Sequence, residues 1–428
     1  MLPGVPPPDD AIAVFTSLRD AFSNDTSTIA VPLILSSVPE TLYIPVRELW
    51  SVYVPLLLWL RYSAAAKEKE EGVAVRYFCG VAGPAGSGKT SLAALLTTLG
   101  GALRLRLQGN FPTMALLSMD AYHLPGVELV ARGLTSVKGA IETIHGTALA
   151  GDLALLTGKT WLPPTATATA TAIDNDNNNT NEVPLASRSS WAIRDPTAVD
   201  SDSDSQLQSF LLPEYDRLKT HDPLIGAVRI GADARIILVE GLFIARGDGA
   251  TSASSNQGGD DSDLDDLGDA GAPTPPSPFL PLGPDATAWP RVLSSLHAVV
   301  VLRVPLALCR ARCLARRMRS QLAREEPVVT ATDHLSAEVC ARLDKNVAHY
   351  AHADAPTWAA VRVDARTRST LVLRVPLPAE LQISVVAAGG DALKVSWQEC
   401  LSALKAVQVR GAAAYDGVTV RRGGVLNK

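Results

Sequence analysis

One stretch decides the fold: C-G-V-A-G-P-A-G-S-G-K-T-S-L, residues 79–92. From Gly83 to Thr90 it matches every fixed position of the phosphate-binding loop pattern G-x-x-x-x-G-K-[S/T]. The preceding residues 73–81 favour a short strand with two aromatics, and residues 91–99 are rich in Ala and Leu and favour a helix. Strand, glycine-rich turn and helix N-terminus together predict an anion site.

Each residue type in the loop has a chemical reason to be there. Because glycine lacks a Cβ, the backbone of the loop can turn so that successive N–H groups point at phosphate oxygens. Lys89 would reach the β- and γ-phosphates, and Thr90 would offer its hydroxyl to Mg²⁺. The predicted nucleotide-binding residues of the loop are Gly83, Pro84, Ala85, Gly86, Ser87, Gly88, Lys89, Thr90 and Ser91. The sequence therefore predicts ATP or GTP binding.

Composition restricts the other function classes. The chain has 428 residues, 47% of them hydrophobic, which is enough for one large domain or two small ones. The net charge of −5 implies no general attraction to nucleic acid. The five cysteines contain no C-x-x-C pair, so we expect reduced thiols in a cytoplasmic protein.

No segment of the sequence predicts membrane insertion or secretion. Residues 1–10 are acidic and rich in proline, unlike a secretory signal. The most apolar run, residues 49–60, is too short to span a bilayer and contains Pro55. We expect a buried or surface-docked helix there, within an N-terminal helical extension over residues 1–72.

Further apolar runs indicate the remaining strands of the sheet. Short buried strands are expected at 115–119, 234–239, 297–304 and 370–375, separated by helices. This order predicts an α/β fold, a three-layer P-loop NTPase sandwich with a mainly parallel sheet, over residues 73–380. Residues 381–428 would form a C-terminal helix and tail.

Two segments break this pattern. Residues 163–209 contain T-A-T-A-T-A-T-A, D-N-D-N-N-N-T-N and S-D-S-D-S, and residues 247–285 are rich in Gly, Asp, Ser and Pro. Such tracts cannot bury enough apolar surface to become ordered. We predict two disordered insertions within the α/β domain.

Two carboxylates follow predicted strands. Asp120 ends the strand at 115–119, and Glu240 ends the strand at 234–239. The carboxyl ends of parallel strands face the ligand crevice of an open α/β sheet. Asp120 could accept a proton from an attacking hydroxyl and also approach Mg²⁺, and Glu240 could act in the Mg²⁺ or water shell. Thr90, Asp120 and Glu240 are thus the predicted metal-side residues.

Basic residues follow in loops and in one helix. Lys138 lies in a loop that could bind an anionic or polyhydroxy acceptor, although such a loop is more often only solvated. The helix after Pro305 carries six arginines, and the overall acidity of the chain argues against nucleic-acid binding. These arginines could close over a nucleotide and neutralise charge on the transferring group.

Together these motifs resemble the P-loop kinases of the phosphoribulokinase, uridine kinase and pantothenate kinase superfamily. The resemblance covers roughly residues 73–363, outside the two insertions. It rests on G-P-A-G-S-G-K-T, S-M-D-A-Y-H-L, K-G-A-I-E-T, P-E-Y-D-R-x-x-x-H-D-P, V-E-G-L and D-K-N. Some motifs look like bacterial-type pantothenate kinase, and the P-E-Y-D-R block looks closer to a nucleoside or sugar kinase-like branch.

The resemblance implies roles for individual residues. Lys89, Asp120 and Arg316 would be catalytic, with Asp120 as the general base toward the acceptor hydroxyl. Arg312, Arg316 and Arg317 would be arginines of a helical lid, and Asn346 would lie near the adenine. The residues expected to line the acceptor pocket are Tyr122, His123, Lys138, Tyr215 and Arg217. ATP and Mg²⁺ would be the cofactors, and a homodimer is compatible with the resemblance.

The sequence departs from this family mainly on the acceptor side. Ala121 stands where many relatives have Gly, Ile141 replaces a common Pro, and Ile144-His145 stands where an aromatic-Asp pair is usual. The lid after Arg319 also lacks the usual glycines. The acceptor therefore stays open among pantothenate, a nucleoside, a sugar or glycerate. A P-loop NTPase that drives a partner, and a nucleotide-binding regulatory protein, remain alternatives to a kinase.

Overall fold

A six-stranded sheet, in the order β11-β10-β9-β3-β8-β4, is the centre of the molecule. The structure is a computed structural model that describes residues 11–22, 27–35, 38–135, 138–158, 188–197, 207–216, 220–245, 288–305, 307–309, 311–313, 369–374, 379–389, 399 and 417–421. Strands β4 (Thr113–Ser118), β8 (Ala234–Gly241), β3 (Tyr77–Ala82), β9 (Ala298–Arg303) and β10 (Ser369–Arg374) pair in parallel. Among the described strands of this sheet, only β11 (Gly417–Arg421) runs antiparallel, beside β10. It lies in the segment 381–428, so the prediction of a helix and tail there is wrong over β11. The predicted mainly parallel sheet is confirmed.

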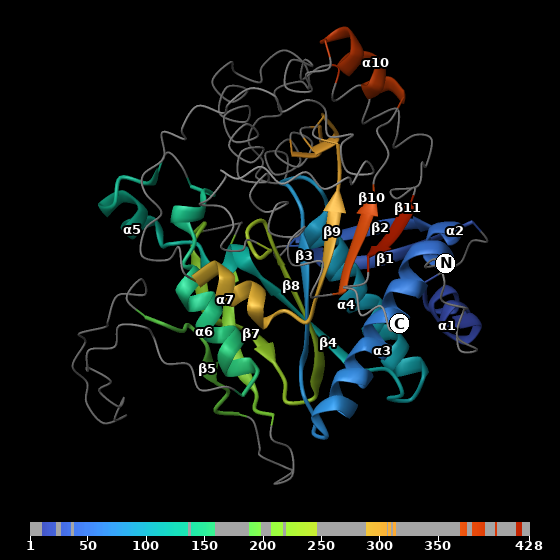
Figure 1. Ribbon diagram of the computed structural model, residues 1–428, viewed down its shortest axis with the longest axis horizontal. Coiled ribbons are helices and arrows are strands. Elements are labelled where there is room, and N and C mark those ends of the chain that lie inside the picture. The colour runs from blue at the N-terminus through green and yellow to red at the C-terminus, as the bar shows by residue number, and fades with distance from the viewer. Residues whose placement is uncertain are drawn as a thin grey trace, which may run out of the picture.

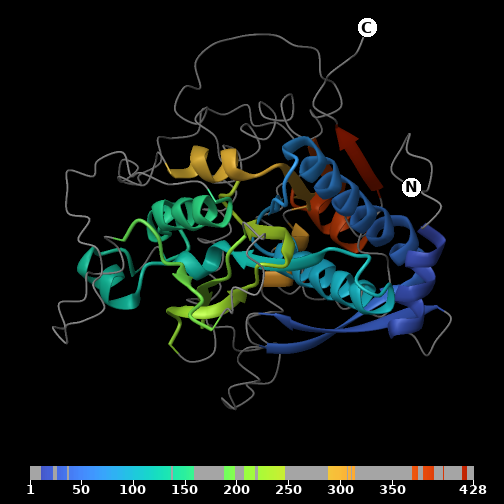
Figure 2. The same cartoon turned by 90° about the horizontal axis from the view of Figure 1, so that it is seen from below.

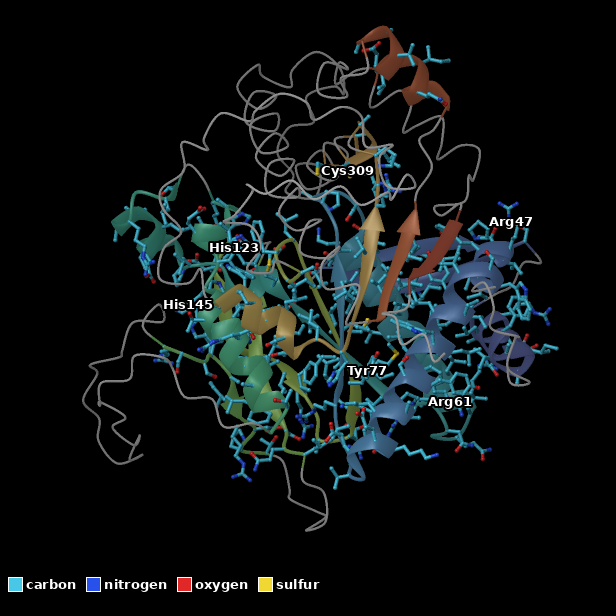
Figure 3. The ribbon with its side chains drawn as sticks, viewed as in Figure 1. Arg47, Arg61, Tyr77, His123, His145 and Cys309 are labelled. Carbon is cyan, nitrogen blue, oxygen red and sulfur yellow. The ribbon has the colours of Figure 1, made fainter. Side chains whose placement is uncertain are left out.

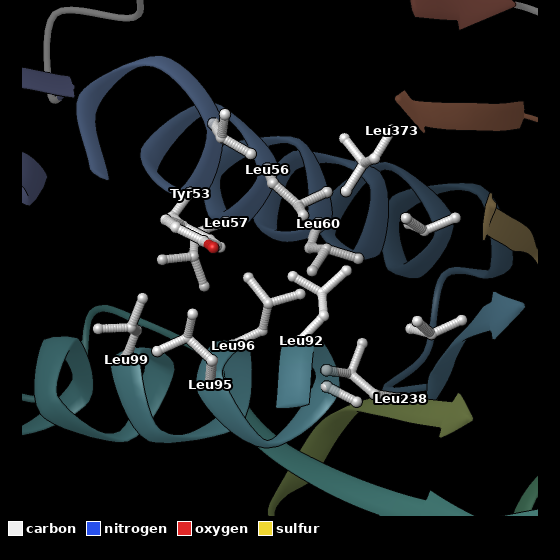
Figure 4. Close-up of a cluster of buried hydrophobic side chains, with 14 of the residues drawn as sticks. Tyr53, Leu56, Leu57, Leu60, Leu92, Leu95, Leu96, Leu99, Leu238 and Leu373 are labelled. Atoms are coloured by element: carbon white, nitrogen blue, oxygen red, sulfur yellow. The ribbon is translucent and has the colours of Figure 1, made fainter. Parts of the chain in front are cut away.

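Helices cover both faces of the sheet, as a three-layer sandwich requires (Figures 1 and 2). The P-loop strand β3 is buried along its whole length, which explains its continuous apolar run. On one face, α3 (Val54–Glu71) and α4 (Lys89–Arg106) pack their leucines against each other and the sheet, as Figure 4 shows. On the other face lie α6 (Gly146–Leu156) and α7 (Ala288–Ser295). A further helix, α10 (Ala379–Ala387), follows β10.

The N-terminal region differs from the expected helical extension. After α1 (Ala11–Phe22), the strands β1 (Thr28–Leu35) and β2 (Val38–Pro45) form an antiparallel hairpin. In β1, burial alternates with a period of two because Ile29, Val31 and Leu33 face the core. The predicted helical extension over residues 1–72 is therefore wrong over β1 and β2.

Pro55 begins a helix and does not break one. The short helix α2 (Val46–Glu48) and a π-helical turn at Leu49–Tyr53 lead directly into α3, where Pro55 occupies the first turn. The Val54 N–H closes the π-helical turn on Leu49 O, and Pro55, which has no N–H, follows where the hydrogen-bond pattern changes. The helix ends at Gly72, whose φ is +70°. Among the described helices, none is long and apolar enough to cross a membrane.

A second, smaller sheet covers the face that carries α6. It is antiparallel, in the order β5 (Ile193–Arg194), β6 (Phe210–Tyr215), β7 (Pro223–Ile230). Residues 188–197 and 207–209 fall inside the insertion that we expected to be disordered, yet Trp191 is only 2% exposed. The prediction is wrong for these residues. The remainder of that insertion and the second insertion lie outside the described residues.

The carboxylate of Asp152 on α6 fixes this segment in place. Asp152 is fully buried and accepts hydrogen bonds from the Tyr122 hydroxyl at 2.7 Å and the Trp191 N–H at 2.8 Å. It also accepts from the Ser190 hydroxyl and from the Ala192 N–H at 3.0 Å. Burial raises the pKa of Asp152, while these hydrogen bonds act in the opposite direction. Four donors around one buried carboxylate explain why a polar tract contains an ordered segment.

The Asp152 network predicts a difference between two substitutions. Asp152→Ala leaves four donors without a partner, so we expect the free energy of unfolding to fall by about 2–4 kcal/mol in urea titrations. Asp152→Asn keeps one oxygen for three donors and can donate to the Tyr122 oxygen, so we expect a loss below about 1 kcal/mol. Equal losses in the two variants would show that the network is not what holds residues 188–192.

Candidate functional site

The phosphate-binding loop lies between the end of β3 and the start of α4. Gly86 and Gly88 have φ values of +80° and +96°, which side chains with a Cβ rarely adopt. The Ser87 N–H donates to the Pro84 carbonyl at 3.1 Å, and the first helical bond of α4 joins Leu92 N–H to Gly88 O at 2.8 Å. The N–H groups of residues 89–91 therefore precede the helical ladder and are oriented for an anion.

The two polar side chains of the loop sit at the start of the helix. The Lys89 ammonium donates to the Pro84 carbonyl at 3.0 Å, so it lies folded over the loop. Thr90, in the same first turn, is partly exposed. A phosphate group placed on the loop would offer the Lys89 ammonium a charged partner in place of a neutral carbonyl, which makes a stronger hydrogen bond.

The helical residues 307–309 and 311–313 pack directly on the loop. A Cβ at Gly86 would collide with the carbonyl oxygen of Cys309 and approach the Cys313 sulfur. The Arg312 guanidinium donates to the Ser87 carbonyl at 3.2 Å. The structure thus places the predicted lid arginine Arg312 beside the loop. Arg316, Arg317 and Asn346, predicted as lid and adenine residues, lie outside the described residues.

The two predicted carboxylates lie on neighbouring strands at the same edge of the sheet. Glu240 of β8 pairs in register with Ser118 of β4 on one side and with Val81 of β3 on the other. Asp120 follows β4 in a 3₁₀ turn over Met119–Tyr122. Glu240 is buried, at 2% exposed, and Asp120 is partly exposed. The sheet therefore brings the phosphate-binding loop, Glu240 and Asp120 to one edge, as the sequence predicted.

These oxygen ligands fit Mg²⁺ and not a softer metal. The hydroxyl of Thr90 and the carboxylates of Asp120 and Glu240 are hard donors, and Mg²⁺ in nucleotide sites takes few protein ligands beside phosphate and water. The described residues contain no cluster of three His, Cys, Asp or Glu side chains that could hold a metal alone. A metal here would depend on the nucleotide for the rest of its ligands.

Three of the residues expected to line the acceptor pocket, His123, Lys138 and Tyr215, lie close together. The His123 ring lies 5.0 Å from the Tyr215 ring, and its Nδ1 is 2.7 Å from the Asp120 carbonyl oxygen. The Lys138 ammonium lies 5.4 Å from the centre of the Tyr215 ring and donates to His221 O at 2.7 Å. Figure 3 shows His123 and Cys309 toward the same edge of the sheet, with His145 lower, at the start of α6. Arg217 lies outside the described residues.

Burial of Lys138 against Tyr215 lowers the pKa of its ammonium below the ordinary 10.5, and nearby Asp222 acts in the opposite direction. Among the described residues, the Lys138 ammonium donates to one carbonyl oxygen, that of His221, and its other two N–H groups could donate to an anionic ligand. The site is thus basic beside Lys138 and acidic where β4 and β8 end.

Tyr122 does not face this acceptor group. It is fully buried, stacks on Trp191 at 5.5 Å between ring centroids, and donates its hydroxyl to Asp152. Burial, together with the Asp152 charge, raises its pKa. We therefore correct its assignment from acceptor binding to structural support. His145, next to the altered Ile144, likewise accepts the Ala148 N–H at 3.2 Å and caps α6.

Sequence reasoning missed two contributors to the site. Asp222 accepts the Gly126 N–H at 2.7 Å and so ties the β6–β7 turn to α5 (Gly126–Ala131). Ser118 donates its hydroxyl to Glu240. Both residues belong to the motifs H-D-P and S-M-D, which pointed to these positions. Their hydrogen-bond partners are distant in sequence and could not be predicted from the motifs.

One cavity of the molecule lies apart from this chemistry. It has a volume of about 650 Å³ and lies between the β1–β2 hairpin and α4, where Pro32, Ile34, Thr97 and Leu116 are among its lining residues. It contains none of the predicted site residues. The site is therefore defined by the sheet edge and not by this cavity.

Comparison with known proteins finds relatives that match part of the chain. No protein-family model matches the chain. Pantothenate kinases from two strains of Corynebacterium glutamicum, ATCC 13032 and R, are each 31% identical to it over 117 residues, which is 25% of this chain. The match spans about a third of those relatives, 36% and 35%. The resemblance to pantothenate kinase among the P-loop kinases is confirmed for this part of the chain.

Three solved structures have low overall similarity. A candidate fructose transport system kinase from Silicibacter sp. TM1040 is 17% identical, with a TM-score of 0.36 over 68% of this chain and 93% of that one. The protein YGR205w is 14% identical, with a TM-score of 0.40 over 76% and 94%. YFH7 from Saccharomyces cerevisiae, a candidate P-loop kinase with a circular permutation, is 10% identical, with a TM-score of 0.39 over 74% and 99%. The fold assignment therefore rests on this chain's own sheet order and loop.

The contact at Gly86 predicts the effect of one methyl group. Gly86→Ala would force a Cβ against the Cys309 carbonyl at a φ of +80°. We expect the affinity for ATP, measured by isothermal titration calorimetry, to fall about 5- to 150-fold because such strain costs on the order of 1–3 kcal/mol. Gly101→Ala on α4 is the matched control, since its Cβ would meet no atom within 4 Å. Equal ATP affinity in both variants would contradict the prediction.

Proposed function

We propose that the protein transfers the γ-phosphoryl group of ATP, with Mg²⁺, to a hydroxyl of a small-molecule metabolite. The observation that carries this proposal is the pairing of β3, β8 and β4, which puts the phosphate-binding loop beside Glu240 and Asp120. A nucleotide-binding loop alone fits many NTPases. A partly exposed carboxylate one strand beyond a buried one, next to a basic acceptor group, fits phosphoryl transfer to a second substrate.

The donor half would hold the nucleotide. The loop N–H groups and Lys89 would bind the phosphates, with Thr90 and Glu240 on the metal side. Mg²⁺, when bound, would neutralise charge on the phosphates. Arg312, which contacts the loop at the Ser87 carbonyl, would donate to a phosphate of the nucleotide. Phosphoryl transfer depends mainly on positioning and charge neutralisation, so none of these side chains needs to form a covalent intermediate with the phosphoryl group.

The acceptor half would hold and deprotonate the second substrate. Asp120 is the proposed base, since its partly exposed carboxyl lies at the end of β4 near the donor half. His123, Tyr215 and Lys138 form the proposed wall of the acceptor pocket, and the cation of Lys138 favours an acceptor that carries a negative charge. The curated relatives are named pantothenate kinase, and a pantothenate-like hydroxy acid is one acceptor that fits these groups.

A cytoplasmic location is part of the proposal. The described cysteines Cys79, Cys309 and Cys313 are buried free thiols, as expected in a reducing compartment. Burial raises the pKa of Cys79 to about 12, which makes it unreactive. A homodimer stays a hypothesis, which sedimentation analysis would test.

The base assignment predicts a separation of binding from chemistry. With a metabolite panel, ATP and Mg²⁺, we expect Asp120→Asn to lower the rate of phosphoryl transfer at least about 100-fold while ATP binding is retained. Lys89→Ala is expected to abolish nucleotide-dependent activity. Asp233→Asn serves as the control because Asp233 is a half-exposed carboxylate at the opposite end of the sheet. Near-normal transfer by Asp120→Asn would refute the assignment, and release of free phosphate without a labelled acceptor would indicate an NTPase.

The lowered pKa of Lys138 predicts a pH dependence of acceptor binding. Lys138 loses its proton as pH rises through a pKa below 10.5, so the KM for an anionic acceptor should rise at a lower pH than for an ordinary lysine. Lys138→Arg keeps its charge at these pH values and should abolish that rise. Lys138→Gln should raise KM at every pH. A Gln variant with the wild-type KM profile would exclude Lys138 from the acceptor pocket.

A further inference from the structure

A single hydroxyl connects the two carboxylate positions of the site. Ser118 is the last residue of β4 and the N-cap of the 3₁₀ turn that carries Asp120. Its oxygen donates a hydrogen bond to a Glu240 carboxylate oxygen and accepts one from the Asp120 backbone N–H at 3.3 Å. The parallel register of β4 and β8 places Ser118 directly beside Glu240, so this contact follows from the sheet itself.

The Ser118 hydroxyl acts both as a hydrogen-bond donor and as an acceptor. A serine has one donor and two acceptor positions, and here it donates to one element and accepts from another. Glu240 is 2% exposed, and a buried carboxylate is oriented by whichever donors surround it. A hydroxyl that holds both the carboxylate and the backbone turn fixes their relative position.

We propose that Ser118 is a positioning residue for the phosphoryl transfer: its hydroxyl orients the Glu240 carboxylate toward the metal and holds the turn that carries Asp120. This inference rests on the proposed function, because it gives Glu240 and Asp120 the roles assigned there. The donor half of the site, on β3 and β8, is thereby linked to the acceptor half, which begins at the end of β4. The Ser118 hydroxyl contacts both halves.

The proposed role of residue 118 requires a side chain with a hydroxyl group. Threonine keeps the hydroxyl and suits a strand terminus, so Ser118→Thr should retain both hydrogen bonds. Alanine removes both. Cysteine is close to serine in size but is a weak donor and acceptor, so Ser118→Cys tests the hydrogen bonds with little change in packing.

The test combines metal binding with kinetics. Mn²⁺ affinity is measured by electron paramagnetic resonance on the full chain with a non-hydrolysable ATP analogue, and kcat and KM are measured with the acceptor found in the metabolite panel. For Ser118→Ala and Ser118→Cys we expect Mn²⁺ affinity and kcat to fall by about 10- to 100-fold, as for other groups that orient metal-side carboxylates. KM for ATP should change little. Ser118→Thr should restore both values.

Each outcome decides between the hypotheses. Wild-type Mn²⁺ affinity and kcat in Ser118→Ala or Ser118→Cys would overturn the inference, as would a Ser118→Thr variant as impaired as Ser118→Ala. If Ser118→Ala fails to fold, Ser118→Cys and Ser118→Thr still separate hydrogen bonding from packing. If the wild-type protein phosphorylates no acceptor, the proposed function fails. The Mn²⁺ measurement then still decides whether Ser118 orients Glu240.

Discussion

Everything at the site depends on the parallel register of β3, β8 and β4. Val81, Glu240 and Ser118 lie side by side across three strands, and the chain turns toward the ligand edge immediately after them. Because side chains alternate between faces along a strand, a slip of one residue would exchange Glu240 with an apolar neighbour and remove the carboxylate from the edge. The apolar cores on both faces, which bury β3 and β8, are what prevent such a slip.

Two buried polar side chains, Asp152 and Arg76, attach the smaller sheet to the central sheet. Asp152 holds residues 190–192 and the Tyr122 hydroxyl. At the amino ends of the strands, the Arg76 guanidinium donates to the carbonyls of Leu156, Gln208 and Gly231, and its burial lowers its pKa to about 10. Both groups fasten β6 and its neighbours to the central sheet. Tyr215, which ends β6 and is proposed to line the acceptor pocket, is therefore positioned by contacts far from it.

The sequence was most informative where one physical cause dominates. The loop at 83–90 and the strands of the parallel sheet were predicted because a fixed glycine pattern and continuous apolar runs leave few alternatives. The hairpin β1–β2 was missed because its prolines concealed a two-residue alternation. Residues 188–197 were missed because the polar tracts around them dominate the composition, whereas their order comes from Asp152, distant in sequence. Such long-range partners cannot be read from local pattern.

Tyr122 and His123 show how the acceptor side is built from adjacent residues with different roles. Because a 3₁₀ turn follows β4 after Ser118, the alternation of side chains in a strand does not predict whether Tyr122 or His123 faces the core. The hydroxyl of Tyr122 donates a hydrogen bond to Asp152, while the His123 ring packs against the Tyr215 ring. Because Asp120 belongs to the same turn, the packing of Tyr122 also holds the proposed base. The altered residues of the acceptor side, Ala121, Ile141 and Ile144, are all buried around this turn. They would therefore act on acceptor choice by repacking the turn and not by touching the phosphate-binding loop.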